Sequence, residues 1–190
     1  MAARSLPNAI TLARLALVPA IVALTYAHRP LPLAAAALLF AVATASDWLD
    51  GYLARRLHAQ STFGTVLDPL VDKILVLCVL FVLADRGLVP LWLALLNMAR
   101  ELAVTAVRQA RSTPARPLGA NWMGKTKFCL QTGFVGLAYA HLLLQSTGRA
   151  LPGGKALLFW CLAGTTALSY GFLVRFWLHS AAAGDEVPRA

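Results

Sequence analysis

The stretch that decides the fold is Asp47-Trp48-Leu49-Asp50-Gly51-Tyr52-Leu53-Ala54-Arg55, followed after eight residues by Gly64-Thr65-Val66-Leu67-Asp68-Pro69-Leu70-Val71-Asp72. It holds four of the eight acidic residues of the chain and lies where two strongly hydrophobic segments meet. A carboxylate at the centre of a membrane helix costs roughly 2.5–3.5 kcal/mol. Four carboxylates in this setting therefore predict a site that supplies compensating positive charge.

The spacing of these aspartates predicts that each pair shares one face of a helix. Asp47 and Asp50 stand three residues apart, and Asp68 and Asp72 stand four apart, which brings their side chains onto neighbouring turns. Two carboxylate pairs that face each other can hold two divalent cations. Because all the ligands are oxygen atoms, Mg²⁺ or Mn²⁺ is favoured over zinc.

The complete pattern, Asp-x2-Asp-Gly-x2-Ala-Arg-x8-Gly-x3-Asp-x3-Asp, is similar to the signature of the CDP-alcohol phosphatidyltransferase family, and all eight specified positions match across 26 residues. The resemblance implies transfer of a phosphatidyl or similar group from a CDP-linked lipid to an alcohol, with release of CMP. It implies that Asp47, Asp50 and Asp68 bind metal, and that Asp72 is the general base and a further metal contact. A polar seam between packed helices is the alternative interpretation.

Small and polar residues near the aspartates are candidates for contacts with CDP-diacylglycerol. The small residues leave room for a flat or bulky ligand, and Arg55 can meet a phosphate. Near the start of the chain, Asn8, Thr11 and Arg14 are spaced three residues apart and form a polar stripe on the first expected helix. The alternative is that they cap this helix and anchor it at the membrane surface. The candidates are Asn8, Thr11, Arg14, Gly51, Ala54, Arg55 and Gly64.

A second group of charged residues, in the fourth and fifth hydrophobic segments, is the candidate site for an acceptor phosphate. It comprises Arg100, Arg108, Lys125 and Lys127. Several cations facing one cavity indicate a dianionic phosphate, which arginine binds bidentately and lysine as a point charge. The alternatives are that the lysines are membrane-surface anchors and that Arg100 pairs with Glu101 or Asp72.

Local sequence narrows the acceptor further. Pro7–Arg14, Ala99-Arg100-Glu101 and Gly124–Lys127 resemble bacterial family members that use glycerol 3-phosphate and form phosphatidylglycerol phosphate. Siblings that use inositol phosphate, serine or phosphatidylglycerol share the aspartate signature. The resemblance also implies a homodimer.

The composition predicts a membrane protein independently of that resemblance. Apolar residues make up 59% of the 190 residues and charged residues 13%, and the mean hydropathy is +0.67. Six hydrophobic segments are long enough to span a bilayer. We expect an all-α bundle of six transmembrane helices with a cytoplasm-facing polar cavity, formed by one domain over residues 1–190. The expected spans are roughly 6–26, 31–57, 65–84, 89–110, 124–144 and 155–178.

The distribution of basic residues predicts the orientation. With six spans, both termini and the second and fourth connections share one side, which carries eight basic residues against four on the other. This bias places the aspartates at the cytoplasmic face of the inner (cytoplasmic) cell membrane. Because the basic residues are dispersed among the expected spans and form no soluble basic domain, nucleic-acid binding is a poor alternative and no nucleic-acid partner is expected. A small transporter or proton relay is the alternative from another class, although a relay would scatter its ionisable groups through the membrane depth.

Overall fold

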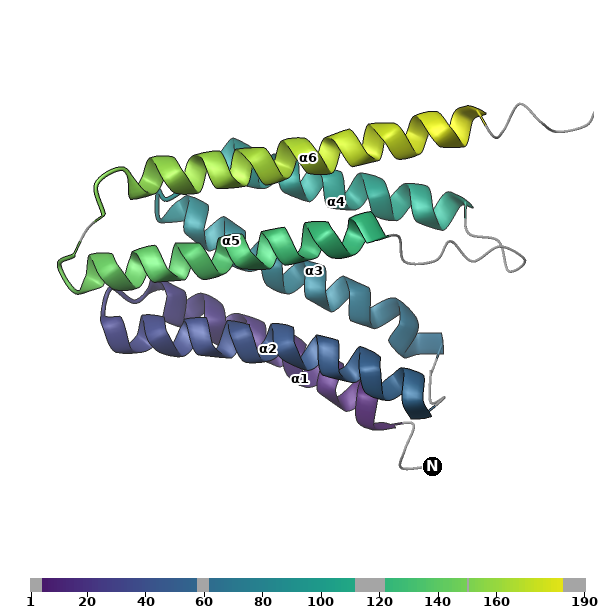
Figure 1. Cartoon of the computed structure of the whole chain (residues 1–190). Coiled ribbons are helices and arrows are strands. Elements are labelled where there is room, and N and C mark those ends of the chain that lie inside the picture. Colours follow the sequence, from purple (N-terminus) through teal and green to yellow (C-terminus); the bar gives the residue numbers. More distant parts are fainter. Residues whose placement is uncertain (1–4, 58–61, 112–121, 150, 183–190) are drawn as a thin grey trace, which may run out of the picture.

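Six helices account for the six hydrophobic segments in the computed structural model of the chain (Figure 1). They are α1 (Ser5–Tyr26), α2 (Pro30–Leu57), α3 (Thr62–Asp85), α4 (Leu91–Arg111), α5 (Trp122–Ser146) and α6 (Gly154–Ala182). The structure describes the backbone of residues 5–57, 62–111, 122–149 and 151–182, and the side chains of 12–46, 71, 73–106, 126–149 and 151–175. No strand occurs in those backbone ranges, so the expected all-α fold of six helices is confirmed.

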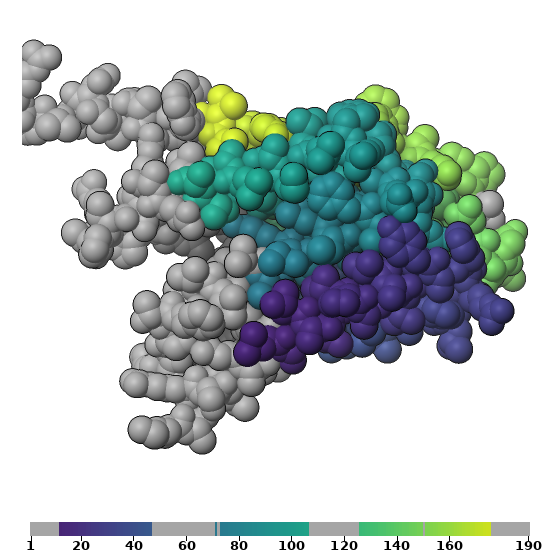
Figure 2. All heavy atoms as spheres, turned by 180° about the vertical axis from the view of Figure 1, so that it is seen from behind, coloured from purple at the N-terminus to yellow at the C-terminus, as the bar shows by residue number. Residues whose placement is uncertain are grey.

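The helices run side by side, with α3 and α5 between the outer pairs. α1 packs against both α2 and α3, α2 also packs against α5, and α6 packs against α4 and α5. Figure 1 shows α1 and α2 together on one side of the bundle and α4 and α6 on the other. Figure 2, seen from behind, shows α1 lying along α3, with α4 beyond. As a result, α3, which carries the second aspartate pair, contacts four of the other helices.

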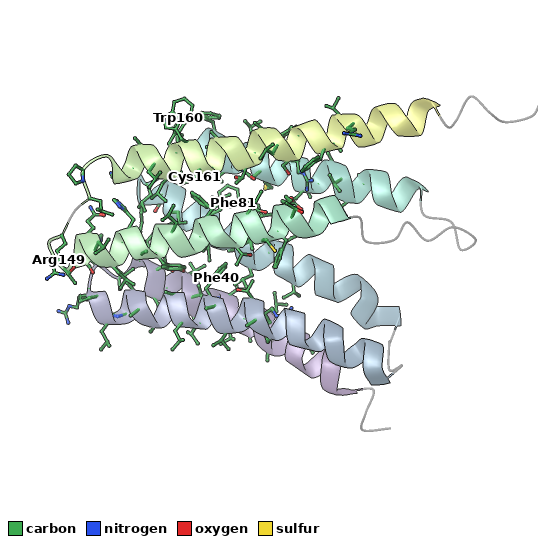
Figure 3. All side chains as sticks on the ribbon, in the orientation of Figure 1. Phe40, Phe81, Arg149, Trp160 and Cys161 are labelled. Atoms are coloured by element: carbon green, nitrogen blue, oxygen red, sulfur yellow. The ribbon has the colours of Figure 1, made fainter. Side chains whose placement is uncertain are left out.

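Large apolar side chains fill the interior between the helices. The exposed fraction is at most 2% for Ile21, Leu33, Leu75, Leu80 and Tyr139. Phe40 points from α2 toward α5 (Figure 3), where its ring lies 6.1 Å from that of Tyr139. The Tyr139 hydroxyl is 2.7 Å from the Thr25 hydroxyl, and this hydrogen bond joins α5 to α1. A single core therefore connects helices from both halves of the chain.

Apolar side chains also cover much of the outer surface. Trp160 points away from the bundle on α6 (Figure 3) and is 70% exposed, while Leu31 is 81% exposed. Leu38 and Leu102 are exposed as well, on α2 and α4. Large exposed apolar surfaces are unfavourable in water and indicate contact with lipid or protein.

Two stretches are long and apolar enough to cross a membrane by length and composition alone. They are Thr126–Ser146 in α5 and Gly154–Arg175 in α6. Shorter apolar stretches, Leu12–Tyr26 and Pro30–Ser46, occupy α1 and α2. These stretches lie within the residues whose side chains are described, which do not include the aspartate-bearing parts of α2 and α3.

The first, third and fifth connections lie at one end of the bundle, and tight turns close two of them. Gly87 and Gly148 have φ angles of 68° and 76°, the left-handed region in which glycine carries no steric penalty. Leu88 N donates to Leu83 O and Arg149 N to Leu144 O, each at the spacing of a Schellman cap. These caps end α3 and α5 and begin the turn into the next helix.

Candidate active site

The backbone brings the four aspartates to the end of the bundle opposite these turns. Asp47 and Asp50 lie in the last part of α2, and Asp68 and Asp72 lie in the first part of α3. Figure 1 shows these two helix segments at the same end as the start of α1 and the end of α6. Each pair therefore lies within about one turn of a continuous helix, as the spacing predicted. Their side chains lie outside the described residues, so their facing arrangement stays a prediction.

Several other predicted site residues can be placed only by their helix. Asn8 and Thr11 lie on α1, and Gly64 lies on α3. The remaining members of this set are Gly51, Ala54 and Arg55 on α2, Arg108 on α4 and Lys125 on α5. Their side chains also fall outside the described part of the structure. Their assignment to the nucleotide lipid or to the acceptor phosphate remains a prediction.

Arg14 is the one candidate contact of the CDP-linked lipid whose side chain is described. It lies on α1 and is 2% exposed. A guanidinium at a membrane surface normally extends into water or headgroups, so burial does not fit a simple surface anchor. This position favours a role inside the bundle, because a buried charge must have polar partners.

A buried ion cluster joins α4 to α5 and contains two of the predicted acceptor residues. The Arg100 guanidinium donates to Glu101 Oε1 at 3.0 Å, and the Lys127 ammonium contacts the same oxygen. All three side chains are at most 13% exposed. Thus Arg100 and Lys127 do come together, and the pairing of Arg100 with Glu101 is observed. One carboxylate between two cations leaves an excess of one positive charge.

Lys73 brings α3 to the same cluster. Its ammonium donates to the Thr105 hydroxyl at 2.5 Å, and that hydroxyl donates to the Glu101 carbonyl oxygen at 2.7 Å. The charges of both Lys73 and Arg100 act on Lys127. Since Lys73 directly follows Asp72, the cluster adjoins the second aspartate pair along α3.

The sequence did not predict roles for Lys73 and Thr105. The position of Lys73 next to Asp72 could have indicated a role for Lys73, because a cation beside a carboxylate pair affects the charge of the site. Nothing in the sequence indicated that Thr105 would lie opposite Lys73. Glu101 was expected only as a partner of Arg100, whereas the structure shows it shared with Lys127.

The donor set determines which cofactor can fit. Carboxylate oxygens at Asp47, Asp50, Asp68 and Asp72 suit hard divalent ions, so Mg²⁺ or Mn²⁺ stays the predicted cofactor. Among the described side chains no group of three or more histidine, cysteine or acidic residues is placed to hold a metal. The four aspartates are not among the side chains to which that statement applies.

Comparison with known proteins gives a match along most of the chain. Residues 4–178 match the family described as CDP-alcohol phosphatidyltransferase. The chain is 38% identical over 154 residues to CDP-diacylglycerol–glycerol-3-phosphate 3-phosphatidyltransferase of Bacillus subtilis, which covers 75% of this chain and 78% of that protein. It is 36% identical over 160 residues to the protein of the same name from Escherichia coli, covering 82% of this chain and 85% of the relative.

A relative with a different name also matches. The chain is 33% identical over 170 residues to the CMP-forming cardiolipin synthase of Oryza sativa. This match covers 80% of the chain but 49% of the rice protein.

Proposed function

Because the chain belongs to the CDP-alcohol phosphatidyltransferase family, we propose that it transfers the phosphatidyl group of CDP-diacylglycerol to glycerol 3-phosphate. The products are phosphatidylglycerol phosphate and CMP. The observation that carries this proposal is the name shared by the bacterial relatives, which are 36% and 38% identical over three quarters or more of this chain. The intact aspartate signature also supports this proposal, because it supplies the carboxylates that the proposed reaction needs.

In the proposed mechanism the four aspartates divide two tasks. Asp47, Asp50 and Asp68 would hold two divalent cations, and Asp72 would act as general base and as a further metal ligand. Enzymes of this family generally depend on a divalent metal, which supplies charge neutralisation and orientation at the diphosphate. Asp72 takes the proton of the acceptor hydroxyl as its oxygen attacks the β-phosphorus of CDP-diacylglycerol. The bond from that phosphorus to the CMP oxygen breaks, and CMP leaves.

The residues proposed to hold the CDP-linked lipid surround this reaction. Gly51, Ala54 and Gly64 leave space for the cytidine, and Arg55 contacts a phosphate. Asn8, Thr11 and Arg14 line the same cleft from α1. The burial of Arg14 supports this placement.

The acceptor phosphate is proposed to bind at the cationic cluster between α4 and α5. Glu101 holds Arg100 and Lys127 in place, while Lys73 adds positive charge from α3. The Nε of Arg100 is buried without a hydrogen-bond partner among the described residues, which leaves a donor for an anion. Arg108 and Lys125 lie on the same two helices. A dianionic phosphate would balance this excess charge, whereas a neutral alcohol would not.

The same proposal places the protein in a membrane. Six helices support a multi-pass protein, as do the exposed apolar surface and the two stretches within the described residues that are suited by length and composition to span a bilayer. We propose that one domain over residues 1–190 spans the inner membrane, that the aspartates face a polar cavity open to the cytoplasm, and that the chain forms a homodimer. The lipid substrate then approaches from the bilayer and the acceptor from water.

An acceptor panel tests the proposed reaction. Purified full-length protein in lipid vesicles is supplied with CDP-diacylglycerol and Mg²⁺, and CMP release is measured with several acceptors. We expect glycerol 3-phosphate to be used, and glycerol to be used far less. Preference for inositol phosphate would contradict the acceptor assignment but not the family. Preference for phosphatidylglycerol would likewise point to a sibling activity within the family.

A substitution at the cationic cluster tests where the phosphate binds. Losing one charge-assisted contact costs roughly 1.5–3 kcal/mol, or about ten- to a hundredfold in affinity. We expect Lys127→Gln to raise the KM for glycerol 3-phosphate by that factor and to leave the KM for CDP-diacylglycerol nearly unchanged. Arg175→Gln is the matched control, because Arg175 is an exposed cation on α6. Equal effects on both KM values for Lys127→Gln would contradict the assigned phosphate site.

A further inference from the structure

A second cationic site lies at the end of the bundle opposite the aspartates. A cavity of about 230 Å³ opens there, lined by His28, Arg86, Leu88, Leu142, Gln145, Ser146 and Lys155. These residues come from the first connection, the turn after α3, the end of α5 and the start of α6. Figure 2 shows residues of the first connection close to those of the α5–α6 region at this end. Four parts of the chain therefore build one cavity.

The lining of the cavity combines positive charge with apolar side chains. Leu88 and Leu142 are 4% and 1% exposed and form the apolar part. Arg86 donates to the Thr25 carbonyl oxygen at 2.6 Å and to His28 Nδ1 at 3.3 Å. The guanidinium is thus fixed in position by α1 and the first connection. A fixed cation in a cavity that is also lined by buried leucines suits an amphipathic anion.

The surrounding charges are not balanced by acids. Among the described residues at this end, the cations are Arg29, Arg86, Arg149 and Lys155, and the single acid is Asp85. The Asp85 carboxylate is exposed, and it raises the pKa of the nearby Tyr26 hydroxyl. Partial burial lowers the pKa of Arg86, because water is removed from the guanidinium. A bound anion would offset this loss of hydration.

The start of α6 strengthens the preference for an anion. The free N–H groups at a helix N-terminus carry partial positive charge and favour acidic side chains. The first turn of α6 contains no acidic residue and has Lys155 at its second position. The side chain therefore adds positive charge where the helix already favours a negative partner.

We propose that this cavity binds the phosphate of an anionic phospholipid headgroup. Lys155 and Arg86 contact the phosphate, and Leu88 and Leu142 accommodate the apolar part next to it. The position at the ends of apolar helices favours a lipid over a soluble ion, since a headgroup is held at that depth by its own acyl chains. The site is separate from the reaction at the aspartates and does not depend on which acceptor is used.

Binding of short-chain lipids to the purified full-length protein in non-ionic detergent tests this site. The titrants are dihexanoyl phosphatidylglycerol, dihexanoyl phosphatidylcholine and inorganic phosphate, measured by calorimetry. We expect the anionic lipid to bind more tightly than the other two. Lys155→Gln should weaken its binding roughly ten- to a hundredfold, and Lys155→Arg should retain it.

Arg149→Gln is the matched control. Arg149 is an exposed cation at the same end of the bundle (Figure 3) but does not line the cavity. Equal weakening by Lys155→Gln and Arg149→Gln would indicate general attraction to a basic surface and would overturn the proposed site. Equal affinities for inorganic phosphate and the anionic lipid would overturn the lipid assignment. Unchanged binding in Lys155→Gln, with the protein folded, would overturn both.

Discussion

Glu101 shows how one carboxylate can organise a cationic site. A buried cation requires polar partners, and two cations close together repel each other. Glu101 accepts hydrogen bonds from Arg100 and Lys127 at the same oxygen, so it holds both cations without neutralising both. The remaining charge is available to an anion. The residue therefore positions the proposed acceptor site rather than taking part in the reaction.

Replacing Glu101 should destabilise the protein strongly. Glu101→Gln keeps the side-chain shape but leaves two buried cations without their carboxylate. Removing one partner of a buried ion pair typically costs about 3–5 kcal/mol, and we expect a decrease of that size in the free energy of unfolding in mixed micelles. Asp85→Asn, which removes an exposed acid, should cost less than about 1 kcal/mol. Similar losses in the two variants would show that the cluster does not stabilise the fold.

The four aspartates should each be essential, but for different reasons. We expect Asp47→Asn, Asp50→Asn and Asp68→Asn to lose turnover because they remove proposed metal ligands, and EDTA to abolish activity that Mg²⁺ or Mn²⁺ restores. Asp72→Asn should abolish CMP release with less loss of CDP-diacylglycerol binding, since it removes the proposed base. Asp85→Asn should retain activity. Full turnover in any one of the three ligand variants would contradict the two-cation site.

At the scale of the helices, the hydrophobic pattern predicted each element and most of its boundaries. The span expected at 6–26 is α1 (Ser5–Tyr26), and the one expected at 31–57 is α2 (Pro30–Leu57). The largest differences are at α6, which continues to Ala182, and α3, which begins at Thr62. Hydropathy finds the apolar part of a helix, whereas hydrogen bonds set its ends.

The contacts between helices could not be predicted in the same way. The link from Lys73 to Thr105 and the sharing of Glu101 by Arg100 and Lys127 join different helices. Such pairs depend on how the helices rotate and pack, which local spacing does not determine. The shared helix face of each aspartate pair could be predicted from the sequence, because each pair lies within a single helix, where spacing alone determines which residues share a face.

Packing between α5 and α6 depends on one position without a side chain. At Gly154, an added Cβ would overlap the imidazole of His141, which is 7% exposed. We expect Gly154→Ala to lower the free energy of unfolding by about 1–3 kcal/mol, measured by chemical denaturation, because the ring has little room to move. Gly164→Ala in the same helix meets no atom within 4 Å. It should be neutral or slightly stabilising.

A double substitution separates this overlap from other effects of the glycine. If the imidazole is the obstacle, Gly154→Ala should cost little in a His141→Ala background, and the two changes should be non-additive. An unchanged cost in that background would show that the helix start at Gly154 is sensitive for another reason.

Across the whole molecule, the two ends of the bundle carry different chemistry. One end holds the aspartate-bearing parts of α2 and α3, and the other holds the cavity lined by Arg86 and Lys155. A membrane protein with an even number of spans keeps both termini on one side. The eight-to-four distribution of basic residues favours the aspartate end as the cytoplasmic one. In the proposed orientation the reaction would have access to a soluble phosphate, and the distal cavity would have access to the opposite leaflet.

Labelling of introduced cysteines in intact cells tests this orientation. In a background with Cys78, Cys129 and Cys161 replaced by serine, one new cysteine is placed at Ala115, between α4 and α5, or at Leu151, between α5 and α6. We expect an impermeant maleimide to label Leu151→Cys in intact cells and Ala115→Cys only after lysis. The reason is that the two connections adjoin opposite ends of α5, which is proposed to span the membrane. CMP release by each variant verifies that the protein is folded. Labelling of Ala115→Cys, but not Leu151→Cys, in intact cells would reverse the orientation and place the aspartates outside. Labelling of both would contradict a membrane-spanning α5.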